Sequence, residues 1–452
     1  MGNQNIVSGV EDLHHVYEDV AVQHRRAHQH SPDAGIELTE QSDQVSPDEE
    51  VAPLVNDDVP HDLIAAPGTA SNAQVAVNII ISFVGAGLLG IPDAFRSSGW
   101  ALGSVALCTV SALNVYAMLL LVQVQQKLTK EGYTGCSSYG QVGRCILGSR
   151  GEILVNICLV ISQAGFATAY IIFIAANLDS IAHIPRAVVC FGCIPGLALL
   201  VQAREMKTLS PFSLLADLAN LAGLSAVLMQ DFESYEPHHD TIHPIRWEGL
   251  LYVVAITIYS MEGVGLVLSL ESSCQNRSNF GFLLKIVLAC ITLFMAFFGI
   301  AGYMAFGKQT TAPITLNLTG GGWATFVKCA LCLALYLTYP IMMFPIWTIS
   351  DDWLPDGAVT HTIFRCLLVL LTAIVAYSVP DFGNFLSLVG SSICIILGFI
   401  LPCYFHLVVM QKELKYWQVA INGFLILGGA LFALLGTYNS FMNLLKRGES
   451  IP

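Results

Sequence analysis

The chain has 452 residues, of which 54% are hydrophobic and only 12% are charged, whereas soluble domains carry about 25% charged residues. Apolar runs recur from residue 73 to residue 438, which excludes a soluble globular protein and predicts one that is embedded in a lipid bilayer. The strict alternation of apolar and polar residues that is typical of membrane β-barrels is absent. The sequence therefore predicts an all-α, polytopic membrane protein.

Residues 1–70 differ in composition from the rest of the chain. They contain fourteen acidic residues and only two basic ones, Arg25 and Arg26, so nearly all of the formal net charge of −13 resides there. A segment with this much charge and few aromatic residues cannot form a packed core, and we predict a disordered, cytosolic, acidic tail. Binding of a cytosolic regulator and a plain solvated tail are both open interpretations. The acidic charge gives no reason to expect a nucleic-acid partner.

Eleven apolar segments are candidates for crossing a bilayer, which takes about 20 residues per helix. They are residues 73–95, 99–126, 152–180, 186–203, 208–229, 249–272, 279–306, 322–347, 360–379, 382–410 and 416–438. We therefore predict 11 transmembrane helices in a transmembrane domain over residues 71–438, followed by a short C-terminal tail over residues 439–452.

The Lys and Arg residues outside the spans predict the orientation, because cytosolic loops carry an excess of positive charge. With the N-terminus in the cytosol, the cytosolic segments hold thirteen Lys and Arg residues and the opposite side holds six. The sequence therefore predicts a cytosolic N-terminus and, with eleven spans, a C-terminus on the far side.

The first predicted span contains the stretch NIIISFVGAGLLGIPDAFRSSGW, residues 78–100, which is rich in residues that weaken a helix. Glycine costs a helix about 1 kcal/mol and proline about 3 kcal/mol relative to alanine. Irregular backbone at membrane depth is tolerated where protein or a water-filled cavity surrounds it, and its N–H groups can then bind a carboxylate. Gly85, Ala86, Gly87 and Leu88 are therefore predicted to bind substrate. Close helix packing through small residues is the alternative.

The sixth predicted span repeats this pattern in SMEGVGLVLSLESS, residues 260–273. Spans 1 and 6 occupy corresponding positions if spans 1–5 and spans 6–10 are two copies of one unit. Because each unit has five spans, an odd number, the second copy would enter the membrane in the inverted orientation. Paired broken helices of this kind indicate a transporter's substrate site, which adds Ser260 and Gly263. Glu262 is a carboxylate within an apolar span and is therefore a functional candidate. It is predicted to couple transport to protons, and capping of the broken helix is the alternative.

The cysteines include two CxxC pairs, Cys190 with Cys193 and Cys329 with Cys332. They lie in apolar segments without the His or further Cys pair that a structural metal site needs, so we interpret them as small packing residues. No intramembrane Ser–His or His–Asp arrangement indicates an enzyme. We expect no metal, no cofactor and no catalytic residue, with a proton as the coupling ion.

Several of these motifs resemble those of a known family. The stretches NIIISFVGAGLLGIPDAFRSSGW, QAGFATAYIIFIAANL, LSPFSLLADLANLAG and YSMEGVGLVLSLESS are similar to amino acid/auxin permeases, and the resemblance covers residues 72 to about 436. It is greatest to plant-type aromatic and neutral amino acid transporters and to vacuolar neutral amino acid exporters. It implies a leucine-transporter-type fold with a 5+5 inverted repeat, proton coupling, and substrate held by spans 1, 3, 6, 8 and 10. It carries over onto Gly85, Ala86, Gly87, Leu88, Glu262 and Gly263.

Two positions depart from the pattern of that family. Asp93 stands where an aromatic residue usually follows the GxP of span 1, which places an extra negative charge at the outer mouth. Asn78 stands where animal proton-coupled members carry a His. Coupling through that His is therefore absent here, which favours Glu262 as the coupling group.

The sequence as a whole predicts a secondary active transporter of neutral or aromatic amino acids, with alternating access around spans 1 and 6. We expect the substrate carboxylate at the backbone near Gly85 and Leu88, and its ammonium group near Ser260 and Gly263. A vacuolar or other acidic-compartment membrane is the expected location, with the plasma membrane as the alternative. An amino acid sensor that signals through its tail and a sodium-coupled symporter are the alternative functions.

Overall fold

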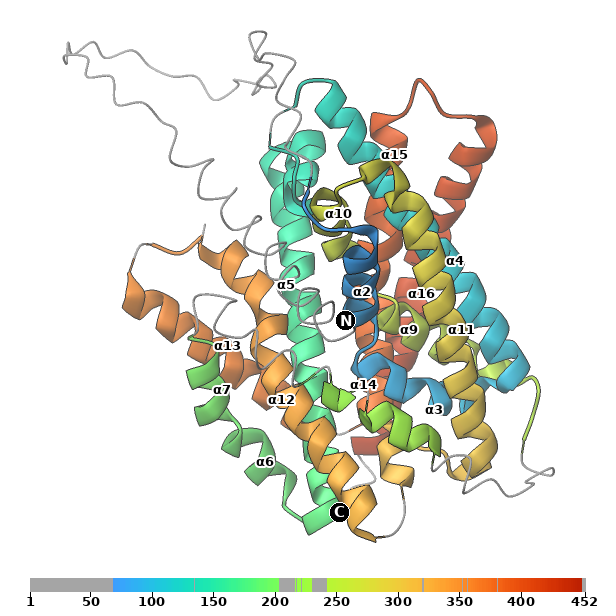
Figure 1. The fold of residues 1–452 in the computed structure, drawn as a ribbon, viewed down its shortest axis with the longest axis vertical. Helices are drawn as coiled ribbons and strands as arrows, with labels where there is room; N and C mark the ends of the chain where they lie inside the picture. Colours follow the sequence, from blue (N-terminus) through green and yellow to red (C-terminus); the bar gives the residue numbers. More distant parts are fainter. Residues whose placement is uncertain are drawn as a thin grey trace.

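The computed structural model describes residues 68–448, except residues 134, 203–215, 217, 221, 230–241, 319–320, 352, 356 and 380. The predicted acidic tail, apart from residues 68–70, lies outside the described residues. All the named elements within the described ranges are helical (Figure 1). The predicted all-α fold is therefore confirmed for this part of the chain.

The helices follow one another in the order of the apolar segments of the sequence. Their bounds are α2 Asn72–Phe83, η1 Ala86–Gly90, α3 Ile91–Ser98, α4 Trp100–Lys130, α5 Tyr139–Ala182, α6 Arg186–Gly192, α7 Ile194–Leu200, η2 Trp247–Gly249, α9 Leu250–Ser260, α10 Val264–Ser273, η3 Arg277–Asn279, α11 Phe280–Phe306, η4 Gly307–Gln309, η5 Ile314–Asn317, α12 Gly321–Asp351, α13 Ala358–Ser378, α14 Phe382–Val389, η6 Gly390–Cys394, η7 Ile396–Ile400, α15 Leu401–Val409 and α16 Tyr416–Gly448.

Eight helices in the described part of the chain are long and apolar enough to cross a membrane. The bent pair Asn72–Phe83 and Ala86–Ser98 makes a ninth if it counts as one span. The predicted fourth span corresponds to the shorter apolar helix Arg186–Leu200, and the fifth to Leu218–Met229, which includes undescribed residues. The multi-pass architecture is thus confirmed, and the count of eleven spans stays a prediction.

The third span begins earlier than the sequence predicts. α5 starts at Tyr139 rather than near residue 152, because Ser138 and Gln141 form a capping box that satisfies the first N–H groups of the helix. Gly148 interrupts the helix with a φ of 67°, a left-handed conformation that glycine adopts without steric strain. The charged residues before position 152 therefore belong to a helix and not to a loop.

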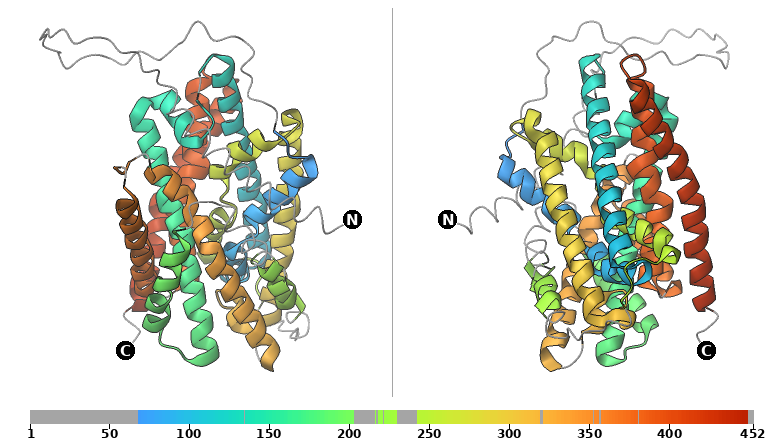
Figure 2. Two further views of the ribbon diagram at one scale, coloured as in Figure 1. Left: turned by 60° about the vertical axis from the view of Figure 1, so that its left-hand side comes forward. Right: turned by 90° about the vertical axis from the view of Figure 1, so that its right-hand side faces the viewer.

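The sixth span lies at the centre of the bundle, where α9 contacts α3, α4, α14 and η6. Accordingly, 78% of the apolar 18-residue stretch of span 6 is buried inside the protein, whereas 22% of the corresponding stretch of α16 is buried. α16 runs along the outside of the bundle (Figure 2) and continues to Gly448, so the first residues of the predicted C-terminal tail are helical. Ser440 in this extension lies 2.8 Å from Ser387 of α14, between their hydroxyl oxygens.

The two broken spans run in opposite directions. In Figure 1 the chain descends from α2 to α3 and rises from α9 to α10, and contacts join α2 to α10 and α3 to α9. Ahead of α2, the Ala70 N–H donates to Ser273 O at 3.0 Å, and the Ala70 carbonyl accepts from Gln275 N–H at 3.0 Å. The fold thereby brings the two interrupted segments side by side in the middle of the bundle.

Candidate functional site

The first span breaks between Phe83 and Ala86, where the second helix is bent by 45° from the first. Gly85 lies between them in extended backbone, with φ −130° and ψ −161°. A methyl group added to Gly85 would meet nothing within 4 Å, so there is room beside its Cα. The first N–H groups of a helix lack partners within that helix. The break therefore presents hydrogen-bond donors next to open space.

The sixth span breaks over residues 261–263, between the end of α9 at Ser260 and the start of α10 at Val264. The Met261 carbonyl accepts a hydrogen bond from Nδ2 of Asn114, which belongs to α4. A backbone carbonyl in the membrane interior needs such a partner when the helix is interrupted. A side chain from span 2 thus supports the backbone of the break in span 6.

The two breaks are in direct contact. A methyl group added to Gly87 would lie 2.6 Å from Ser260 Oγ and 2.9 Å from Ser260 Cα, and one added to Gly263 would overlap the Phe83 ring. These approaches leave no room for a side chain, so glycine is required at both positions. Of the residues that the sequence predicts to bind substrate, the structure brings Gly87, Ser260 and Gly263 together.

The other predicted residues of the first break differ in their surroundings. Ala86 and Leu88 are 3% and 0% exposed and belong to the hydrophobic core. Their side chains are therefore occupied by packing, and only their main-chain groups are available to a substrate. Among the glycines of the two broken spans that the structure describes, Gly85 is the one that adjoins free space.

Four buried polar atoms of α4 and α9 have no hydrogen-bond partner in the structure. They are Ser111 Oγ, Asn114 Oδ1, Tyr259 Oη and Ser260 Oγ, and their residues are only 3% to 7% exposed. Buried polar atoms are nearly always paired, so a cluster of unpaired ones indicates a place for a ligand or for water. The sequence prediction did not include Ser111 and Asn114. Their i, i+3 spacing within an apolar span places both on one face of a helix and was the available signal.

Glu262 lies at the break itself and is half-buried. Its carboxylate faces the backbone N–H of Val264, the first residue of α10, and Tyr139 and Cys394 are the nearby phenol and thiol groups. No ion pair joins it to a Lys, Arg or His among the residues that the structure describes. The position of Val264 is the one that the capping interpretation requires, and the lack of a positive partner is what the proton-coupling interpretation requires.

Spans 3 and 10 pack against the break of span 6. The rings of Phe166 and Tyr259 meet edge to face with their centroids 4.7 Å apart. Ser162 Oγ lies 4.0 Å from Cys394 Sγ in η6, which links α5 to span 10 at the same level. The break is thus bordered by aromatic surface as well as by polar atoms.

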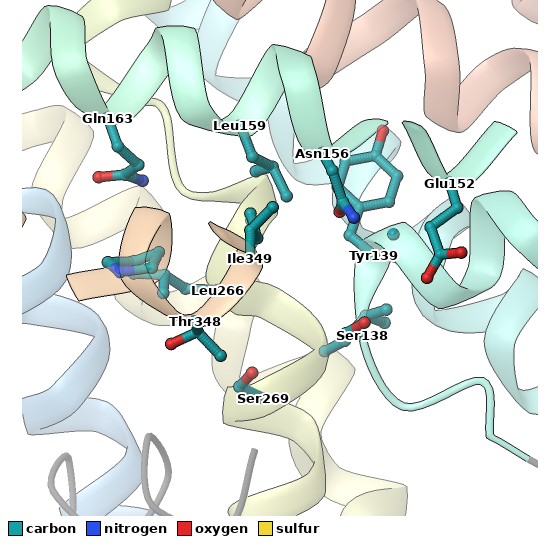
Figure 3. Close-up of a pocket in the computed structure, with 14 residues that line it drawn as sticks. Ser138, Tyr139, Glu152, Asn156, Leu159, Gln163, Leu266, Ser269, Thr348 and Ile349 are labelled. Atoms are coloured by element: carbon teal, nitrogen blue, oxygen red, sulfur yellow. The ribbon is translucent and has the colours of Figure 1, made fainter. Parts of the chain in front are cut away.

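A pocket of about 100 Å³ lies between α5, α10 and α12 (Figure 3). It includes Gly265, two residues beyond Gly263, and it extends along α10 to Ser269. The labelled side chains that line it in Figure 3 come from all three helices: Ser138, Tyr139, Glu152, Asn156, Leu159, Gln163, Leu266, Ser269, Thr348 and Ile349. This pocket adjoins the α10 side of the break.

A larger pocket of about 860 Å³ lies on the opposite side, around α3 and η2. Asp93 lines it but is only 5% exposed. Its carboxylate accepts hydrogen bonds from Tyr252 Oη at 2.7 Å and from Arg96 Nε at 2.8 Å. The negative charge predicted at this mouth is therefore compensated by Arg96, and Asp93 joins α3 to α9.

The cysteine pairs offer little to a metal ion. Cys190 and Cys332 are buried, whereas Cys329 is exposed. Within the described ranges, no group of three or more His, Cys, Asp or Glu side chains could hold a metal ion. The candidate site there consists of backbone groups, hydroxyls, an amide and one carboxylate.

Comparisons with known proteins place the chain in a family. The model of the family of transmembrane amino acid transporter proteins matches residues 68–442. Amino acid transporter AVT3B of Arabidopsis thaliana is 35% identical over 396 residues, which cover 83% of this chain and 94% of that protein. Amino acid transporter ANT1 of the same plant is 36% identical over 399 residues, or 82% and 92% of the two chains.

More distant similarities extend to yeast and to a solved structure. Vacuolar amino acid transporter 3 of Saccharomyces cerevisiae is 26% identical over 369 residues, which cover 75% of this chain and 52% of that protein. The crystal structure of MhsT in complex with L-phenylalanine aligns over 83% of this chain and 99% of that chain, with 11% identity and a TM-score of 0.48. That score does not establish a shared fold, so the leucine-transporter-type repeat stays a prediction.

The matched region contains both broken spans, the unpartnered polar atoms and, apart from Asn443 and Lys446, the residues that line the two pockets. The plant relatives match over nearly their whole length. The chain therefore belongs to the transmembrane amino acid transporter family, which is the amino acid/auxin permease family that its motifs resemble.

Proposed function

We propose that this protein carries neutral or aromatic amino acids across a membrane, with alternating access around the broken spans 1 and 6 and with coupling to protons. Membership of the family supplies the class of amino acid transporter. One observation supports the finer proposal above all. The two breaks touch at Gly87 and Ser260, beside unpartnered buried oxygens and beside open space at Gly85.

The substrate carboxylate would bind at the first break. The helix that resumes at Ala86 would offer the N–H groups of its first residues and the positive end of its dipole there, ahead of the Leu88 N–H, which donates to Gly85 O. Gly85 allows a ligand to approach the backbone closely because it has no side chain. The ammonium group would lie across from it, where Ser260 Oγ and Tyr259 Oη are buried oxygens without partners. A zwitterion would thus satisfy both breaks at once.

The surroundings of the breaks favour an uncharged substrate side chain. Among the described residues that form the two breaks, Glu262 is the single ionisable group. Phe166, Tyr259 and Phe83 supply aromatic surface at the same level, and such rings pack well against apolar or aromatic side chains. An acidic side chain would face Glu262 without a positive partner, which is expensive in a buried site. A basic side chain would compete with the proton for Glu262, so coupling to protons through this residue favours an uncharged one.

Coupling to protons would use Glu262. A carboxylate in the membrane interior is costly, and such residues commonly mark proton pathways. The α5–α10–α12 pocket and the larger pocket around α3 adjoin opposite ends of the broken spans. They would become the two access routes as one repeat of a 5+5 inverted, eleven-span arrangement rocks against the other. No cofactor is needed, because the proton gradient supplies the free energy.

We place the protein in a vacuolar membrane with the N-terminus in the cytosol. The support is the name of the yeast relative, a vacuolar amino acid transporter, together with the excess of Lys and Arg in the predicted cytosolic loops. Fluorescence microscopy of the tagged protein beside a vacuolar membrane marker tests the location. Protease digestion of an N-terminal tag on intact vacuoles tests the orientation.

Uptake into proteoliposomes tests the function. Purified protein would be reconstituted and given radiolabelled phenylalanine, alanine, arginine or glutamate, with an inward proton gradient, an inward sodium gradient or neither. We expect proton-stimulated uptake of phenylalanine and alanine and little uptake of arginine and glutamate. Glu262→Gln should remove the stimulation by protons.

Three results would contradict parts of the proposal. Stimulation by sodium instead of protons would identify a sodium-coupled symporter. Uptake confined to charged amino acids would overturn the substrate class. Binding without uptake of any amino acid, together with a tail that recruits a cytosolic protein only when substrate is present, would identify a sensor.

A further inference from the structure

Asn114 and Glu262 share a small space in front of Gly398. A methyl group added to Gly398 would lie 3.5 Å from Glu262 Oε2 and 3.7 Å from Asn114 Oδ1. The three residues come from α4, the break of span 6 and η7. Because Gly398 has no side chain, Asn114 Oδ1 from span 2 and Glu262 Oε2 from span 6 face the same free volume beside span 10.

The two ends of the Asn114 amide are in different states. Nδ2 donates to the carbonyl of Met261, which fixes the orientation of the amide and turns Oδ1 away from that carbonyl. Oδ1 has no hydrogen-bond partner, although Asn114 is only 3% exposed. An amide oxygen accepts hydrogen bonds and cannot donate them. The space in front of Gly398 therefore lacks a donor.

We infer that Asn114, Glu262 and Gly398 form a proton-binding site, in which Asn114 is a positioning residue for the Glu262 carboxyl group. This inference rests on the proposed function, because it concerns the proton that drives transport. A protonated carboxyl group is an O–H donor, whereas a carboxylate only accepts. When Glu262 takes up a proton, its O–H donates to Asn114 Oδ1, directly or through one water. When it loses the proton, two acceptors face each other without a donor.

The same amide connects the proton to the break of span 6. Asn114 Nδ2 donates to the Met261 carbonyl, and the Glu262 carboxylate faces the Val264 N–H at the start of α10. A proton shared between Glu262 and Asn114 therefore ties both ends of the break to α4. When this proton is lost, the Glu262 carboxylate still faces the start of α10, but its hydrogen bond to Asn114 of α4 is broken. Protonation would thus bias the angle between α9 and α10, the element that rocking requires.

The other titratable groups near this site cannot replace Glu262. Tyr139 of α5 already donates its hydroxyl hydrogen to Leu397 O at 2.9 Å. Cys394 of η6, which lies 4.0 Å from Ser162 Oγ, and the buried Cys158 and Cys403 are the thiol groups in the surroundings of Glu262 and Tyr139. These are phenol and thiol groups, which are neutral near neutral pH. Glu262 is therefore the group whose charge changes in this part of the protein.

The test is the ratio of uptake with an inward proton gradient to uptake without one, measured in proteoliposomes for Asn114→Leu, Gly398→Ala and Glu262→Gln. We expect the ratio to fall to near one for Asn114→Leu, as for Glu262→Gln, and the double variant to show no further loss, since residues that act as a unit are not additive.

Gly398→Ala keeps the Asn114–Met261 hydrogen bond but fills the shared space. We expect it to shift the pH of half-maximal uptake by about one unit, a tenfold change in proton affinity.

Two matched controls separate coupling from folding. Asn177→Leu removes another fully buried amide, which is paired with Phe173 O and Thr315 Oγ1, and should lower stability without changing the ratio. Gly428→Ala adds a methyl group to a glycine of α16 that has nothing within 4 Å, and should leave the pH profile unchanged.

The outcomes distinguish this inference from the proposed function. If wild type shows no stimulation by protons, the proposed function is wrong. If wild type is stimulated and Glu262→Gln is not, while Asn114→Leu and Gly398→Ala keep the wild-type ratio and pH profile, the inference alone is wrong. Should Asn114→Leu be inactive with and without the gradient, Gly398→Ala decides: a wild-type pH profile overturns the inference, and a shifted one supports it.

Discussion

The two broken spans carry the same glycine pattern but present different chemistry. The first break, at Gly85 and Ala86, has no hydroxyl or ionisable side chain and offers backbone groups beside open space. The second, between Ser260 and Gly263, has a buried hydroxyl and a carboxylate. The repeated glycines therefore reproduce a backbone geometry rather than a binding surface. One break is suited to a carboxylate ligand and the other to a cation and a proton.

The two halves of the broken spans are also joined differently. α3 and α9 are linked by the Tyr252–Asp93 hydrogen bond, which involves a charged side chain. On the other side, the segment before α2 is linked to the end of α10 by two backbone hydrogen bonds of Ala70. Bonds to charged groups contribute about 1.5–3 kcal/mol, and neutral ones about 0.5–1.5 kcal/mol. The two neutral bonds of Ala70 together contribute about 1–3 kcal/mol, which the Tyr252–Asp93 bond alone does not exceed. Arg246, just before η2, adds hydrogen bonds from its N–H to Ser98 O at 2.7 Å and from its guanidinium group to Arg96 O at 3.2 Å. With these bonds, the α3–α9 side is expected to be the more firmly closed of the two.

The largest effect is expected where the breaks touch. Gly87→Ala would place a methyl group 2.6 Å from Ser260 Oγ and 2.9 Å from Ser260 Cα. Overpacking of this kind costs about 1–3 kcal/mol, and it would separate the two breaks. We expect uptake to fall by about tenfold or more, as a loss of about 1.4 kcal/mol implies, with a lower melting temperature in detergent.

Gly423→Ala is a matched control for this prediction. It adds a methyl group to an α16 glycine with nothing within 4 Å, and alanine favours a helix over glycine. Its uptake and melting temperature should equal or exceed those of wild type. Normal uptake by Gly87→Ala would show that transport does not require the contact between the two breaks, and the proposal that they form one binding site would be wrong.

The sequence was sufficient to predict that spans 1 and 6 break, because clustered glycines, followed in span 1 by a proline, weaken a helix at membrane depth. It was not sufficient to predict where span 3 begins. Arg144 and Arg150 resemble a loop in composition, yet Ser138 and Gln141 start a helix there by capping. The capping pattern was visible in the sequence, but hydropathy alone gave it no weight.

A smaller effect is expected from opening the α3–α9 side. Tyr252→Phe removes the hydroxyl that donates to Asp93 but leaves the Arg96 contact in place. A loss of about 1.4 kcal/mol changes an equilibrium about tenfold. We expect a cysteine at Ser97, which lines the larger pocket, to be labelled by a polar thiol reagent about tenfold faster, with the exposed Cys108, Cys290 and Cys329 replaced.

Tyr438→Phe in the same background is the control, because that tyrosine is 66% exposed on α16 and lies outside the pocket lining. Its labelling rate should equal that of the parent. If Tyr252→Phe is labelled no faster than this control, the Asp93 bond does not close the α3–α9 side, and the proposed asymmetry between the two sides is wrong.

The next effect tests the polar break by itself. Ser260→Ala removes a buried hydroxyl that has no partner in the structure, so the substrate-free protein should keep or gain stability. If this oxygen binds the substrate, a lost hydrogen bond of about 1 kcal/mol raises KM for uptake by about fivefold. A lower melting temperature with unchanged KM would indicate a structural role for the hydroxyl.

The polar atoms of the site show where sequence reasoning stops. Ser260 and Glu262 were predicted because they lie beside the broken segment. Asn114 was not, because its partner Met261 is 147 residues away in the chain and no local pattern connects the two. Gly398 likewise acquires significance only from the oxygens that face it. Contacts between distant spans depend on tertiary packing, which one sequence does not reveal.

The smallest effect is expected at a carboxylate remote from both breaks. Glu413, in the turn between α15 and α16, forms an exposed ion pair with Lys127 of α4. The hydrogen bond and charge of Lys127 lower the pKa of Glu413 from its ordinary value. Stability from this pair is therefore present above the unfolded-state pKa and is lost as the pH falls through the lowered folded-state pKa. Exposed pairs contribute little, because solvent and salt screen them.

Glu413→Gln should accordingly leave uptake at neutral pH unchanged and make the acid side of the stability profile slightly flatter. The measurement is the melting temperature of wild type and variant between pH 3 and pH 7, at low and high salt, with any difference confined to low salt. Glu262→Gln in the same series should instead change uptake and its response to protons. If Glu413→Gln changed proton-stimulated uptake as strongly, surface charge rather than the broken span would control coupling, and the contrast between the two breaks would lose its functional meaning.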